Sequence, residues 1–243
     1  MKNDMLQIYR GEDYVINDLI RIHQPTLGEI ADFGEQRYFT VVHMLCATPT
    51  DCKYQLHLQG INWEEISDFD LFLLYAKSFQ KEDTSLLLGS LDLSTYGRYL
   101  NQENGELCLY NPDTNSIIDA SIHELMVSFL RKVHGLKRHV EISGNEFTHK
   151  ALLEEAEEEF QLQKNKEYES SLMPLISTML GMEGFGYNHN TVWDMKLLAF
   201  MDSVRRIPSI KNTDLLLQSG YSGFGIDLKK VNKKELNYFR DLD

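Results

Sequence analysis

The chain has 243 residues, of which 42% are hydrophobic and 11% aromatic, and its formal net charge is −13. This length and composition exclude a chain that is disordered throughout, and they are sufficient for one large domain or two modest ones. The acidic balance disfavours nucleic acid and anionic membrane surfaces as partners, since both are negatively charged.

The first 25 residues have the pattern of a β-hairpin. Apolar groups in Leu6–Arg10 and in Tyr14–Ile16 flank the turn-forming residues Gly11, Glu12 and Asp13. Short apolar runs on both sides of such a turn are typical of paired strands. We therefore expect a hairpin at the N-terminus.

Helical patterns follow up to residue 80. Thr26 and Glu29 have the spacing of a capping box, and the apolar face behind them continues past Gly34 to Pro49. A second helix is predicted from Thr50 to Gly60, and a third after another capping box, formed by Ser67 and Asp70.

The middle of the chain is predicted to contain a small sheet and a helix. Short apolar runs at Leu86–Leu93 and Glu106–Asp119 alternate with turn residues, as strands do. Ser121 and Glu124 predict the start of a helix that Gly135 ends. The fold class is therefore α+β, predominantly α-helical, with a short N-terminal β-hairpin and a small mid-chain antiparallel sheet.

The sequence predicts an acidic helix and linker at residues 146–170. This segment lies between an N-terminal α+β domain (1–145) and a C-terminal helical module (171–243). The helix alternates clustered glutamates with apolar residues, which is typical of a helix lying on a protein surface. In the C-terminal module, a helix from Val192 is expected to end before Pro208, followed by a shorter helix, glycine turns and a final helix starting at Asn232.

Five aromatic residues of the C-terminal module are candidates for partner binding. Tyrosine and tryptophan supply large rigid area with a polar tip, which suits a protein interface, while the same residues suit a hydrophobic core. Both interpretations stay open for Tyr187, Trp193, Phe200, Tyr221 and Phe224.

One set of residues has the chemistry of a metal site. His43, Cys46, Cys52 and His57 are all zinc-ligand types, but their spacing is not that of a known zinc finger, and packing as core or surface residues explains them better. We also find no nucleophile motif, no complete zincin motif at His123 and no phosphate loop among the glycines at 181–186 or 220–225. No catalytic residue, metal or cofactor is predicted.

A basic strip and the cysteines bear on partners and location. Lys132, Lys137 and Arg138, with His134 and His139 between them, could contact nucleic acid or form the solvated end of a helix. The odd number of cysteines, three, and the lack of a signal-peptide pattern favour a reducing cytoplasm. No apolar run approaches the roughly 20 residues that span a bilayer.

Segments at both ends of the chain carry a family resemblance. Gln24–Tyr38 with Gly60–Asp70, and Tyr187–Met195 with Phe200–Ile207, resemble proteins from the structural and tail-assembly regions of tailed bacteriophages of Gram-positive hosts, including tail assembly chaperones. The resemblance offers no catalytic residues.

The resemblance implies a non-enzymatic role in the host cytoplasm, as a chaperone that binds the tape-measure or tail-tube protein during tail morphogenesis. A structural subunit of the virion, such as a connector, tail or baseplate component, is the alternative, and a homo-oligomer would fit it. A metal-dependent enzyme using His43, Cys46, Cys52 and His57 is a third hypothesis from a different class.

Overall fold

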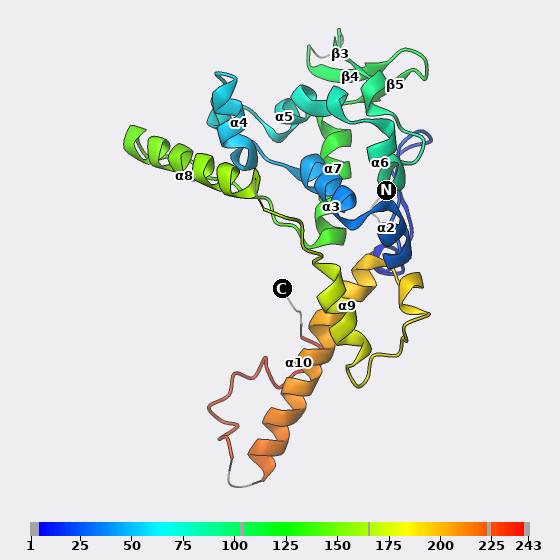
Figure 1. Cartoon of the computed structure of the whole chain (residues 1–243), viewed down its shortest axis with the longest axis vertical. Coiled ribbons are helices and arrows are strands. Elements are labelled where there is room, and N and C mark those ends of the chain that lie inside the picture. The colour runs from blue at the N-terminus through cyan, green and yellow to red at the C-terminus, as the bar shows by residue number, and fades with distance from the viewer. Residues whose placement is uncertain (1–4, 103–104, 165, 223–224, 241–243) are drawn as a thin grey trace. The chain divides into compact units, whose positions relative to one another are not determined.

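The computed structural model describes residues 5–102, 105–164, 166–222 and 225–240 (Figure 1). The chain divides into two compact units, and the division passes through the helix at residues 27–33. Unit 1 comprises Glu29–Glu169 and the segment before Thr26, and unit 2 comprises Thr26–Gly28 and the chain from Ser170 onward. In this division the acidic helix predicted within 146–170 belongs to unit 1.

Unit 1 begins with a short helix and a hairpin, α1 (Met5–Tyr9), β1 (Tyr14–Val15) and β2 (Arg21–Ile22). The strands are antiparallel, with Tyr14 opposite Ile22. The predicted hairpin is confirmed, but its placement was wrong, because the first predicted strand is helical. The buried Gln24 side chain donates hydrogen bonds of 2.9 and 2.8 Å to the carbonyls of Ile8 and Glu12, which holds the helix end by a contact distant in sequence.

Two helices replace the single one predicted after Thr26. They are α2 (Leu27–Phe33) and α3 (Glu35–Cys46), and Gly34 separates them. Gly34 has φ 97° and ψ 112°, a conformation that side-chain-bearing residues avoid. The apolar periodicity continues across the break, which is why the sequence reads as one helix.

Short helices continue to residue 95. These are η1 (Thr50–Cys52), α4 (Lys53–Leu58), η2 (Trp63–Glu65), α5 (Asp68–Tyr75), η3 (Ala76–Ser78), α6 (Lys81–Leu88) and η4 (Leu93–Thr95). The predicted capping box at Ser67 and Asp70 is confirmed. The strand predicted at Leu86–Leu93 is wrong, because Thr84, Leu87 and Leu88 are buried at helical spacing on α6.

The mid-chain sheet has the order β3 (Gly97–Leu100), β4 (Leu107–Asn111), β5 (Ser116–Ile118), all antiparallel. It confirms the predicted fold class together with the hairpin and the helical majority. The helix α7 (Ala120–His134) follows and packs on α3, with its core side chains on one face. Its cap is Asp119, which accepts a 2.8 Å hydrogen bond from the Ile122 amide, and not the predicted Ser121. Gly135 ends it with φ 64°, as expected.

The last helix of unit 1 is α8 (Glu146–Lys164), which contacts α4 and projects beyond it (Figure 1). None of its residues is buried.

Unit 2 contains α9 (Leu172–Leu180), η5 (Val192–Asp194) and α10 (Leu197–Tyr221). The helix predicted from Val192 starts five residues later, because Lys196 is extended and pairs with Thr26 in an isolated β-bridge. The predicted stop at Pro208 was also wrong, since α10 continues through it to Tyr221. Asn232 caps a turn and not a helix, accepting a 3.0 Å hydrogen bond from the Lys234 amide. Among the described residues, no helix combines the length and apolar character needed to cross a membrane.

Candidate functional site

The five aromatic candidates of unit 2 differ in exposure. Tyr221 is 80% exposed and Tyr187 41% exposed, and Trp193 is half-buried in η5. Phe200 is fully buried, and its ring centroid lies 6.4 Å from that of Phe185. Phe200 is thus a core residue of the folded chain, which corrects its assignment as a contact residue. Phe224 lies outside the described residues.

The residues considered for zinc do not form a site. In the described part of the chain, no group of three or more His, Cys, Asp or Glu side chains could hold a metal ion. Burial raises the pKa of the Cys46 thiol to about 12 and that of Cys52 to about 11, so both are protonated at neutral pH. Protonated thiols are poor nucleophiles. The two histidines, His43 and His57, are exposed.

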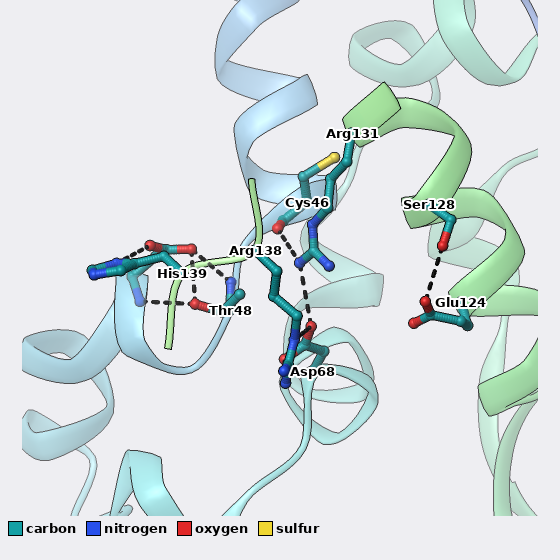
Figure 2. Close-up of polar contacts among 9 residues, drawn as sticks. Cys46, Thr48, Asp68, Glu124, Ser128, Arg131, Arg138 and His139 are labelled. Atoms are coloured by element: carbon teal, nitrogen blue, oxygen red, sulfur yellow. Dashed lines mark hydrogen bonds and ion pairs between the residues drawn. The ribbon is translucent and has the colours of Figure 1, made fainter. Parts of the chain in front are cut away.

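A buried ion-pair cluster joins α5 to α7 and to the segment after α7. Asp68 Oδ2 accepts hydrogen bonds from Arg131 Nη2 at 3.2 Å and from Arg138 Nε at 2.9 Å, and Oδ1 accepts from Arg138 Nη2 at 3.0 Å (Figure 2). The Asp68 and Arg131 side chains are only 12% and 11% exposed. Burial alone would raise the pKa of Asp68, but the hydrogen bonds from both arginines outweigh it and lower the pKa. Arg131 also donates to the Cys46 carbonyl at 2.8 Å, which ties the end of α3 to the same cluster.

A second group of polar contacts fixes the chain after α7. Lys53 Nζ lies 2.5 Å from Glu141 Oε2, and this hydrogen bond is the main cause that lowers the pKa of Glu141. The Glu141 amide donates to Thr50 Oγ1 at 3.1 Å, and His139 Nδ1 lies 3.1 Å from Asp51 Oδ1. These contacts hold the segment at residues 136–141 against η1 and the start of α4.

Several residues of the basic strip suggested by the sequence make contacts within the fold, so the strip does not form one cationic surface. Arg138 pairs with Asp68, His139 with Asp51, and His134 is hydrogen-bonded to the Tyr38 hydroxyl at 2.6 Å. These side chains therefore have roles in packing and cross-linking, which does not favour a nucleic-acid surface.

A cavity of about 410 Å³ lies beside this cluster. Its walls come from the ends of α3 and α7, from η1 and α4, and from the C-terminal half of α8. Three cations, Lys53, Arg131 and Lys137, line it together with the rings of Tyr54 and Phe160. The carboxylates of Asp51 and Glu159 line it as well, and Lys53 and Arg131 pair with Glu141 and Asp68.

Aromatic contacts join α8 to α4 and η2. The rings of Tyr54 and Phe160 are 5.4 Å apart, and the Tyr54 hydroxyl donates to Glu157 at 3.2 Å. The His149 ring stacks on Trp63 with centroids 4.1 Å apart. Phe160 is one of the apolar residues from which the sequence predicts that the acidic helix lies on a protein surface. The sequence does not predict that Tyr54 and Trp63 contact this helix.

Comparisons with protein-family models, with curated proteins and with solved structures found no match for this chain.

Proposed function

We propose that the chain is a non-enzymatic assembly protein of a tailed bacteriophage, acting as a tail assembly chaperone that binds the tape-measure or tail-tube protein. The family resemblance of the two chain ends supports this role. A chaperone of this kind needs apolar side chains that are available to a partner's helix.

The observation that carries the proposal is the exposure of large apolar side chains on the helices of unit 2. Tyr221 and Leu215 on α10 are 80% and 65% exposed, and Met173 on α9 is 68% exposed. Flexible methionine and rigid tyrosine side chains suit the capture of varied apolar segments. Each of these groups costs free energy in water that a partner would recover by covering it.

The titratable groups with shifted pKa values support a non-enzymatic role. Asp68 and Glu141 are held by cations in structural ion pairs, and His123 lies against the rings of Phe69 and Phe72. Each shift has a packing explanation, and structural pairs perturb pKa values as active sites do.

The first test is quantitative mass spectrometry of finished particles and of infected-cell lysate, normalised to the tail-tube subunit. Abundance in lysate with absence from particles is the expected result. A stoichiometric amount in particles would contradict the chaperone role and favour the structural virion subunit.

A second test uses matched variants in a co-purification with tape-measure and tube proteins. Tyr221→Ala should weaken the association while leaving the melting temperature unchanged, because the side chain is exposed. Phe239→Ala removes another aromatic side chain of unit 2, which is 90% exposed and is not one of the five partner-binding candidates. This variant should bind as the wild type does. Equal binding of both variants would remove Tyr221 from the interface.

A further inference from the structure

We propose that the surface of α4 and η2 beneath α8 binds an amphipathic helix of the partner protein, and that α8 covers this surface until the partner displaces it. The binding surface is thus occupied by a segment of the same chain. That the natural partner is a tail protein rests on the proposed function, whereas the displaceable contact is argued from unit 1 alone.

The helix α8 is attached by one side only. It has 19 residues, none of them buried, and Phe147 and Leu162 are 85% and 73% exposed. In proteins most of the stability of a helix comes from tertiary packing, so tertiary contacts decide where α8 lies. Those contacts include α4 and η2, and the departure of α8 would expose the apolar cluster on which it packs.

The surface beneath α8 is apolar and formed by other elements. Leu56, Trp63 and Leu71 pack together, each at most 3% exposed, and Leu152 and Leu153 of α8 pack on this cluster. The buried Trp63 Nε1–H has no hydrogen-bond partner among the described residues. An unpaired buried donor is costly.

The fit of α8 is incomplete over its C-terminal half. There the cavity of about 410 Å³ separates Phe160 and Glu159 from Lys53, Arg131 and Lys137. A helix with bulkier apolar residues would fill this space, and Lys137 on the wall would attract an acidic side chain beside its apolar stripe, whereas Lys53 and Arg131 already pair with Glu141 and Asp68. The occupant that fits is therefore an acidic amphipathic helix, as α8 itself is.

Polar contacts hold the N-terminal end of α8 and the residues just before it. Glu64 of η2 accepts a hydrogen bond from Ser143 Oγ at 3.1 Å and lies 3.5 Å from His149 Nδ1. The cavity lies at the opposite half of the helix. Displacement should begin at the C-terminal half, where Tyr54 supplies the aromatic contact and the hydrogen bond to Glu157.

The test uses a labelled peptide with the sequence of residues 145–164 as the probe and the full-length chain as the receptor. Phe160→Asp removes the contact with Tyr54 and loosens α8, and Phe147→Asp is the same change at an exposed position of the same helix. We expect the Phe160→Asp chain to bind the peptide about tenfold more tightly than the wild type, because a larger fraction of molecules has the surface open. The Phe147→Asp chain should bind as the wild type does.

Two further measurements locate the binding. Tyr54→Ala in the Phe160→Asp chain should lower the affinity for the peptide again, since Tyr54 belongs to the surface and not to α8. In a Trp193→Phe background the remaining tryptophan is Trp63, whose emission should shift to the red in the Phe160→Asp chain and return when the peptide binds.

Three results would overturn the proposal. The first is equal peptide affinity in the wild-type, Phe160→Asp and Phe147→Asp chains, and the second is binding that Tyr54→Ala leaves unchanged. The third is a concentration-dependent dimer of the Phe160→Asp chain that the peptide dissociates, since this would assign the surface to α8 of a second copy.

Purified tape-measure and tube proteins separate this proposal from the proposed function. Peptide binding without any association with tail proteins would support the displaceable surface and contradict the chaperone role. Tail proteins that bind the wild-type, Phe160→Asp and Tyr54→Ala chains equally would support the chaperone role and overturn the surface proposed here.

Discussion

The Tyr38 hydroxyl lies 2.6 Å from Nε2 of His134, and this contact joins α3 to the end of α7. His134 Nδ1 lies 2.7 Å from the Leu130 carbonyl, which can only accept, so Nδ1 carries a proton. The Tyr38 hydroxyl then donates to Nε2. Burial lowers the pKa of His134 to about 4 and raises the pKa of Tyr38, so both side chains are neutral around pH 7.

Tyr38→Phe should destabilise unit 1 by about 1–2 kcal/mol, because the His134 acceptor loses its donor in a largely closed site. Denaturant unfolding followed by circular dichroism measures this change. Tyr99→Phe removes a hydroxyl from a tyrosine that is 41% exposed and should leave the unfolding free energy nearly unchanged. Equal effects of the two substitutions would show that the contact between Tyr38 and His134 contributes nothing.

Acidification from pH 6.5 to about 4 should reduce the stability of unit 1. Burial lowers the pKa values of both His123 and His134 from 6.5 to about 4, so in this window the unfolded chain binds more protons than the folded one. The contribution of the two neutral histidines to the free energy of unfolding is therefore fully present above pH 6.5. It falls as the pH decreases, by on the order of 2–3 kcal/mol for each histidine. Urea midpoints measured across this range test the prediction.

A matched pair of variants assigns the acid sensitivity. His123→Phe, between Phe69 and Phe72, should reduce the slope of stability against pH, whereas His57→Gln, at an exposed position, should not. An unchanged slope in His123→Phe would mean that His123 does not contribute.

Asp68→Asn should destabilise unit 1 by about 2–4 kcal/mol, because it leaves the buried Arg131 guanidinium without a counter-charge. Arg138→Ala should cost less than about 1 kcal/mol, since the Arg138 side chain is 56% exposed and water replaces it. Thermal and urea unfolding of both variants give the comparison. A larger cost for Arg138→Ala than for Asp68→Asn would contradict this account of the ion pairs.

Gly34→Ala should destabilise unit 1 by about 1–3 kcal/mol, because φ 97° with ψ 112° is a backbone conformation almost confined to glycine. The added Cβ would meet only Arg37 Cβ at 4.0 Å, so the cost arises from the backbone and not from a clash. Gly144→Ala is the control, since a Cβ there meets nothing within 4 Å and its φ is not in the left-handed region. A neutral result for Gly34→Ala would show that α2 and α3 can join into one helix.

The sequence predicts local structure correctly where neighbouring residues decide that structure. The capping box of Ser67 with Asp70 and the left-handed Gly135 depend on contacts within a few residues, and both predictions are confirmed. Strands β4 and β5 lie within the predicted run Glu106–Asp119, whereas β3 (Gly97–Leu100) was not predicted and the run Leu86–Leu93 begins inside α6. These features established the α+β class with its helical majority.

Predictions failed where a distant segment decides the local structure. Residues 6–9 are helical beside the buried Gln24 amide, and α10 starts only after Lys196 has paired with Thr26. Phe200 has the same helical spacing as exposed aromatics, and only packing shows that it is buried. Apolar periodicity gives one face of a helix but not what covers that face.

The sequence by itself determined the class of fold, the acidic character of the chain and a few helix ends, such as Ser67 and Gly135, because these depend on composition and on neighbouring residues. Tertiary structure alone decided that the Asp68 carboxylate pairs with two arginines, 63 and 70 residues further along the chain. It also decided that Tyr54 contacts Phe160 of α8 and that Trp63 contacts His149 of α8. Such contacts join residues with no local relationship. Their energy depends on burial and geometry, which exist only once the chain has folded.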